Sequence, residues 1–171
     1  MKHIACGLLL LTTLLITSSC KKNKSFVESG ASPGRLFRKT LVGVEITSLR
    51  IIELPRYSPN GEKWDSWALG SKEPDVYVKM VQLDSTLFAT EVIEDYLFKE
   101  PILFTIGIPF TVKAFTTDIR LEVFDEDGIS ADDNIGYFTF NLMKYEKKEK
   151  VTLSRPDGTL TLEIGLRWMY Q

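Results

Sequence analysis

The C-terminal part of the chain reads TLTLEIGLRW over residues 159–168, and this stretch decides the fold class. Apolar side chains occupy every second position from Leu160 to Trp168, and polar residues or glycine stand between them. Successive side chains of a β-strand point to opposite faces, so this alternation predicts a strand with one buried face. The segment KVTLS (150–154) precedes it across the turn sequence RPDG (155–158), which predicts a hairpin.

The same alternation recurs along the chain, and helical periodicity is hard to find. With the C-terminal hairpin, the predicted strands number about eight; those upstream cover residues 42–54, 75–83, 88–93, 103–108, 118–124 and 135–142. A chain of 171 residues with 44% hydrophobic and 26% charged residues is typical of one globular domain. We therefore predict an all-β fold, an eight-stranded antiparallel Greek-key β-sandwich over residues 41–171.

The N-terminus has the features of an export signal. A short basic segment (1–3) is followed by a mostly apolar segment (4–16) and by the small residues of TSSC (17–20). The apolar run is shorter than the ~20 residues that span a bilayer. A cysteine directly after small residues resembles a bacterial lipoprotein signal, which implies a signal peptide over 1–19 and a lipid on Cys20. The alternative is ordinary signal-peptide cleavage that leaves Cys20 as a free thiol.

The lipoprotein resemblance further implies a location in the bacterial cell envelope, with the protein held in the outer membrane or at the cell surface. Residues 20–40 mix Lys, Ser, Gly and Pro without apolar periodicity, and they are interpreted as a tether between the anchor and the domain.

Removal of residues 1–19 would leave a chain with unusually few reactive side chains. It would remove His3 and Cys6, so that no histidine and only Cys20 remain. This composition excludes internal disulfides, zinc sites built from His or Cys, and catalytic triads that use His or a thiolate. Without Lys2, 20 basic residues face 23 acidic ones, a formal charge of −3 that does not favour nucleic acid. We expect a protein that is not an enzyme.

One loop concentrates negative charge. Residues 123–138 read VFDEDGISADDNIGYF, with five acidic residues between positions 125 and 133. Two carboxylates ~4 Å apart repel each other by roughly 4 kcal/mol near a protein surface, so the cluster calls for solvation, a cation or catalysis. An EF-hand also begins D-x-D, but Ser130 stands where it needs glycine and Gly136 where it needs a bidentate glutamate. The EF-hand alternative is therefore rejected.

The acidic segment has the spacing of a different calcium loop. It runs from a strand into D-x-D, then through five residues to Asp133 and a glycine in the next strand. Upstream, PDVYVKM (74–80) and KWDSW (63–67) occur in the expected order. Together these motifs resemble the C2 domain, the eight-stranded sandwich of synaptotagmins, protein kinase C and phospholipases. The resemblance covers residues 41–169, with a longer first loop than in the animal domains.

The resemblance implies a Ca²⁺ site at one end of the sandwich. The implied carboxylate ligands are Asp65, Asp75, Asp125, Asp127 and Asp133. The backbone carbonyl of Glu126 and the hydroxyl of Ser130 would lie close to the ions, whereas the side chains of Glu126 and Asp132 would point away. The alternative is a C2 scaffold whose loops bind no metal and whose aspartates serve as turn residues.

Apolar residues beside the predicted ligands indicate a surface that could contact a membrane. The resemblance implies membrane contact for Trp64, Trp67, Leu69 and Ile129, although the tryptophans could instead pack the longer loop against the sandwich. We expect a lipid-anchored envelope protein that binds Ca²⁺ and, through it, acidic lipid headgroups or membranes. The alternative is an adaptor or structural lipoprotein, calcium-stabilised or metal-free, that contacts another envelope protein.

Overall fold

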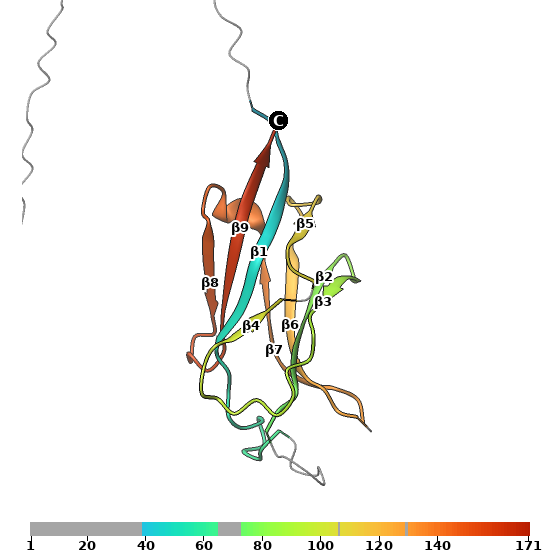
Figure 1. The fold of residues 1–171 in the computed structure, drawn as a ribbon, viewed down its shortest axis with the longest axis vertical. Helices are drawn as coiled ribbons and strands as arrows, with labels where there is room; N and C mark the ends of the chain where they lie inside the picture. Colours follow the sequence, from blue (N-terminus) through green and yellow to red (C-terminus); the bar gives the residue numbers. More distant parts are fainter. Residues whose placement is uncertain (1–38, 65–72, 106, 129) are drawn as a thin grey trace, which may run out of the picture. The chain divides into compact units, whose positions relative to one another are not determined.

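The structure is a computed structural model that describes residues 39–64, 73–105, 107–128 and 130–171. Two antiparallel sheets pack face to face over these residues (Figure 1). Sheet A has the order β4-β1-β9-β8, and β5 also pairs with β1; its strands are β1 (Leu41–Glu53), β4 (Ile102–Phe104), β5 (Phe110–Val112), β8 (Lys150–Ser154) and β9 (Thr161–Tyr170). Sheet B has the order β3-β2-β6-β7; its strands are β2 (Val76–Gln82), β3 (Ser85–Ala89), β6 (Ile119–Asp125) and β7 (Asp133–Phe140).

The predicted all-β sandwich is confirmed, but two short strands, β4 and β5, take the place of the one strand predicted over residues 103–108. Strand β4 pairs with residues 49–51 of β1, and β5 pairs with residues 44–46 of the same strand. The two short segments therefore share the position of one edge strand beside β1. A single turn of 3-10 helix, η1 (Leu142–Tyr145), lies in the connection between β7 and β8.

The β2–β3 hairpin is the main difference from the predicted strands. The sequence pattern predicts a strand over 88–93, whereas β3 ends at Ala89 and begins at Ser85. Leu83 and Asp84 both have positive φ, which makes a tight two-residue connection. Such turns favour Asn-Gly or Asp-Gly, so a Leu-Asp pair carries no turn signal that sequence reasoning would recognise.

The core lies between the sheets and follows the predicted alternation. In β9 and just before it, Leu160, Leu162 and Ile164 are fully buried. In β6, the inward positions are Ile119, Leu121, Val123 and Asp125, all at 0% exposure. Every second residue of β6 faces the core, and Asp125 is the last of them. Its carboxylate therefore lies at the edge of the core.

The two ends of the sandwich differ in what they carry. At one end, the backbones of Thr40 and Gln171 exchange two hydrogen bonds of 2.8 and 2.9 Å. At the other end lie the connections that follow β1, β3 and β6, which we call the loop end (Figure 1). Across the described parts of the chain, no helix is long and apolar enough to cross a bilayer.

Candidate functional site

Strand register brings three of the predicted ligands to the loop end. Asp75 directly precedes β2, Asp125 ends β6 and Asp133 begins β7. The pairing places Val76 opposite Asp125 and Asp125 opposite Asp133. Residues about fifty positions apart in sequence are therefore neighbours across three adjacent strand ends.

Asp125 is the most buried acidic residue of the site. Its side chain is at 0% exposure, and Oδ1 accepts a hydrogen bond of 2.7 Å from the backbone N–H of Asp75. Burying an ionised carboxylate is costly unless hydrogen bonds or an opposite charge compensate for lost hydration. A carboxylate in this position is therefore suited to bind a cation rather than to mark a solvated turn.

Asp75 connects the other two loops of this end. Its Oδ1 accepts a hydrogen bond of 2.6 Å from the backbone N–H of Asp95, which lies in the connection after β3. Its carbonyl oxygen accepts one of 2.8 Å from the backbone N–H of Glu126, which follows β6. Asp75 thus fixes both neighbouring loops relative to the start of β2.

The remaining predicted ligands are less closely gathered. Asp127 is half-buried, whereas Asp133 is exposed and borders a hollow of about 330 Å³ with Trp64 and residues of the first loop. Within the ranges that the structure describes, no three acidic, His or Cys side chains form a group that could hold a metal ion. Glu126 and Ser130 have exposed side chains. Predicted residues that lie outside the described ranges are Cys20, Asp65, Trp67, Leu69 and Ile129.

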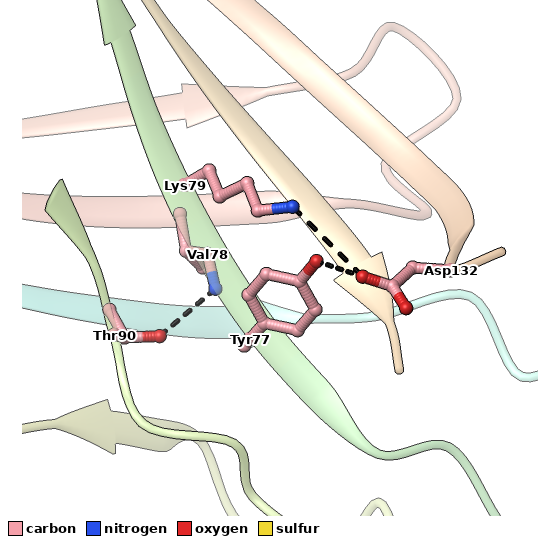
Figure 2. Close-up of polar contacts among 5 residues, drawn as sticks. All are labelled: Tyr77, Val78, Lys79, Thr90 and Asp132. Carbon is pink, nitrogen blue, oxygen red and sulfur yellow. Dashed lines mark hydrogen bonds and ion pairs between the residues drawn. The ribbon is translucent and has the colours of Figure 1, made fainter. Parts of the chain in front are cut away.

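Asp132 has partners that the sequence did not predict. Its Oδ2 accepts a hydrogen bond from the Tyr77 hydroxyl and lies 4.0 Å from Lys79 Nζ (Figure 2). The bond from the Tyr77 hydroxyl lowers the pKa of Asp132, and the nearby Asp127 backbone N–H and Lys79 act in the same direction despite partial desolvation. Burial, together with the bond to Asp132, raises the pKa of Tyr77, so the tyrosine remains the proton donor.

An aromatic platform supports this contact on the outer face of sheet B. The rings of Tyr77 and Phe124 stack with centroids 5.4 Å apart. Lys79 Nζ lies 5.0 Å from the first ring centroid and 4.6 Å from the second, within the range of cation–π contacts. Tyr77 and Phe124 are register partners of β2 and β6, so strand alignment would have found this pair, whereas Asp132 lies 55 positions from Tyr77 and gives no local signal.

The interpretation of Trp64 as a membrane contact is wrong. Trp64 is only 7% exposed, and its Nε1–H donates a hydrogen bond of 2.7 Å to the Pro55 carbonyl. It packs in the core cluster, which agrees with the alternative that the longer loop is held against the sandwich. The indole is buried because its large apolar area gains more from the core than from solvent.

Other apolar side chains are exposed at the loop end. Tyr57, four residues after β1, is 57% exposed, and Leu97, in the loop fixed by Asp75, is 55% exposed. Neither residue belongs to a periodic pattern or lies next to a predicted ligand. Exposure of single apolar residues on loops has no sequence signal, which explains why sequence reasoning missed them.

The residue types at this end are oxygen donors of the kind that a hard divalent cation binds, although the described ones are not gathered into a metal-binding group. Carboxylate and carbonyl oxygens are the ligands that Ca²⁺ takes in proteins. The buried carboxylate of Asp125 shares a hydrogen bond with Asp75, and Lys63 is engaged elsewhere, with Nζ 2.5 Å from Glu73 Oε1. The donor chemistry at this end is therefore that of carboxylate oxygens, one of them buried at Asp125.

Comparisons with known proteins agree with this geometry. The family model of the C2 domain matches residues 44–156. A solved structure described as a C2 domain is 22% identical, with a TM-score of 0.50 over 74% of this chain and 96% of that one. A C2 domain of plant extended synaptotagmin 1 is 18% identical, with a TM-score of 0.53 over 77% and 98%. Human GIVD cytosolic phospholipase A2 is 15% identical, with a TM-score of 0.50 over 77% of this chain and 18% of that one. No curated protein matches the sequence.

Proposed function

The chain is a member of the C2 domain family, and from that premise we propose that its loop end binds Ca²⁺ and thereby engages acidic lipid headgroups or membranes. The observation that carries the proposal is the fully buried Asp125 carboxylate, hydrogen bonded to the Asp75 backbone at the edge of the core. The described residues that would hold the ion are Asp75, Asp125, Asp127 and Asp133, with Asp65 from the first loop. The protein acts as a binding module rather than an enzyme.

Each part of the loop end has a separate task in this function. Bound Ca²⁺ supplies positive charge and coordination positions that an anionic headgroup can fill. Asp75 holds the loop after β3 in place through its carboxylate and the loop after β6 through its carbonyl oxygen. Tyr57 and Leu97 offer exposed apolar surface next to the charged site. The combination of anion binding and apolar contact favours a membrane interface over a purely polar partner.

We further propose that a lipid on Cys20 anchors the protein in the bacterial cell envelope. The support for this part is the basic, apolar and small-residue order of positions 1–20. A calcium-dependent loop end would add an attachment that responds to the ion.

Calcium is expected to stabilise the protein against heat, and the double substitution Asp125→Asn with Asp127→Asn is expected to abolish the effect. A ligand that binds only the folded state at 100 times its Kd adds about 2.7 kcal/mol to the free energy of unfolding. Asparagine at 125 keeps an oxygen for the Asp75 N–H, so the fold is preserved while the charge is lost. Differential scanning calorimetry with calcium and with chelator measures the shift.

The matched control for this experiment is Asp84→Asn. Asp84 is exposed in the β2–β3 turn, at the opposite end of β2 from Asp75. Its variant should keep the full calcium response. A wild-type protein whose melting temperature is the same with calcium and with chelator would contradict the proposed metal site.

Calcium is also expected to bring the protein onto vesicles that contain phosphatidylserine, and Leu97→Ala is expected to weaken this binding by up to about fiftyfold when the side chain is fully inserted. The reason is that each CH₂ group removed from water contributes ~0.8 kcal/mol, and alanine lacks three carbons of leucine. Co-sedimentation of a protein without the lipid on Cys20 measures the effect. The control is Leu83→Ala, because Leu83 is 77% exposed at the far end of sheet B.

Two results would separate membrane binding from the adaptor alternative. Equal losses for the leucine variants at positions 97 and 83 would show that the loop end is not the contact surface. A calcium-dependent rise in stability without vesicle binding would favour a calcium-stabilised adaptor that contacts an envelope protein.

A further inference from the structure

The Asp132 side chain joins the third loop to strand β2. This loop connects β6 to β7 and carries Asp127 near its start and Asp133 at its end. Asp132 immediately precedes Asp133, yet its carboxylate lies against β2, where Oδ2 accepts the proton of the Tyr77 hydroxyl (Figure 2). One side chain therefore ties the end of the loop to a strand outside the β6–β7 pair.

The Asp132 carboxylate also lies near the start of the loop. The nearby backbone N–H of Asp127, five residues earlier, favours the ionised carboxylate and helps to lower the pKa of Asp132. A loop whose end is tied to a strand has fewer conformations open to it than a free loop of the same length. The bond from Tyr77 therefore restricts the positions of both neighbouring aspartates.

The strand side of this contact is well supported. Tyr77 is 6% exposed and stacks on Phe124. Lys79 lies over both rings and 4.0 Å from the Asp132 carboxylate. Between them, the backbone N–H of Val78 donates a bond of 3.0 Å to Thr90 Oγ1 on the other side of β2 (Figure 2). The hydroxyl that holds Asp132 is therefore part of a packed strand.

We propose that Asp132 is a positioning residue: its bond from Tyr77 and its ion pair with Lys79 hold the end of the third loop against β2, a contact that we call the clasp, and thereby position Asp127 and Asp133 for the cation. The inference rests on the proposed calcium site, because it assigns the residue that orders that site. A preordered loop loses less freedom when a ligand binds, which raises affinity without a new contact to the ion. Partners that orient metal ligands typically change metal affinity by 10–100-fold when they are mutated.

The test compares Asp132→Ala, Asp132→Asn and Tyr77→Phe in the full chain. Two quantities are measured: the hydrogen-exchange rate of the Asp127 amide in chelator, and the calcium Kd by titration calorimetry. Alanine and phenylalanine remove one side of the clasp, so both variants should show at least ~10-fold faster exchange and ~10-fold weaker calcium binding. Asparagine keeps an acceptor oxygen and should stay within about threefold of the wild type.

Two control variants and a measurement of equilibrium stability separate an effect on the third loop from an effect on the whole domain. Tyr137→Phe removes the hydroxyl of a tyrosine that is 61% exposed on β7, and Asp84→Asn removes a remote charge while keeping a side chain that tolerates the positive φ of the turn; both should behave as wild type. Urea midpoints of all variants show whether faster exchange reflects the loop or the whole domain. If the urea midpoint falls in Asp132→Ala alone, its faster exchange reflects unfolding of the whole domain. The Tyr77→Phe variant, with an unchanged midpoint, then shows whether the clasp exists.

Several outcomes would overturn the inference. Unchanged Asp127 exchange in both Asp132→Ala and Tyr77→Phe would show that no clasp exists. Equal calcium losses in Asp132→Asn and Asp132→Ala would assign the effect to charge and not to position. A wild-type protein that binds no calcium would overturn the proposed function and the positioning role with it, while the exchange rates would still decide whether the loop is clasped.

Discussion

Replacing Trp64 by alanine is expected to lower the free energy of unfolding by about 3–5 kcal/mol, as is typical when a buried aromatic side chain is deleted. The indole is 7% exposed and belongs to the core cluster, so its loss opens a cavity beneath the first loop. It also leaves the Pro55 carbonyl without its 2.7 Å bond. The urea midpoint should fall by more than about 1 M, because the slope for small proteins is ≈ 1–3 kcal/mol per M.

Two further variants separate packing from membrane contact at this position. Trp64→Phe keeps most of the buried area and should lose far less stability than alanine. Leu97→Ala removes an exposed side chain and should change the free energy of unfolding by no more than about 0.5 kcal/mol. A Trp64→Ala protein that unfolds at the wild-type midpoint would contradict the burial of this residue.

Replacing Phe104 by alanine should be equally severe, with a loss of about 3–5 kcal/mol. Phe104 is 1% exposed, and it pairs in register with Leu49 of β1, which is fully buried. The strand that carries it, β4, has only three residues, so one side chain provides much of its contact with the core. Thermal unfolding and urea titration measure the change.

The control lies next to it in the same strand. Leu103 is 53% exposed on the outer side of β4, and Leu103→Ala should stay close to the wild-type stability. Similar losses for the two variants would mean that β4 does not have a buried and an exposed side.

The strands of this domain were largely predictable because alternation survives wherever one face of a strand is buried. In β9, each apolar position from Leu160 to Leu166 is buried as predicted. In β6, the same period ends on Asp125 and thereby places one site residue in the core. The pairing of β2 with β6 then brings Asp75 next to Asp125.

The parts that could not be predicted depend on contacts between distant segments. The burial of Trp64 accompanies its bond to the Pro55 carbonyl, nine positions away, and the sequence pattern around it is the same for a packed and an exposed tryptophan. The bond between Tyr77 and Asp132 joins a strand to a loop across 55 positions. An acidic residue next to a predicted ligand is expected to face solvent, so nothing local distinguishes a loop clasp from surface charge.

The hydrogen-bonded pair of Thr40 and Gln171 marks the end of the sandwich that lies opposite the loop end. Strand β1 runs 13 residues from this pair to the loop end, roughly 40 Å at ~3.3 Å per residue. A support that grips either of these two residues therefore holds the domain by its base and leaves the acidic loops pointing outward. A surface that the loops bound would then be separated from that support by about the length of one strand.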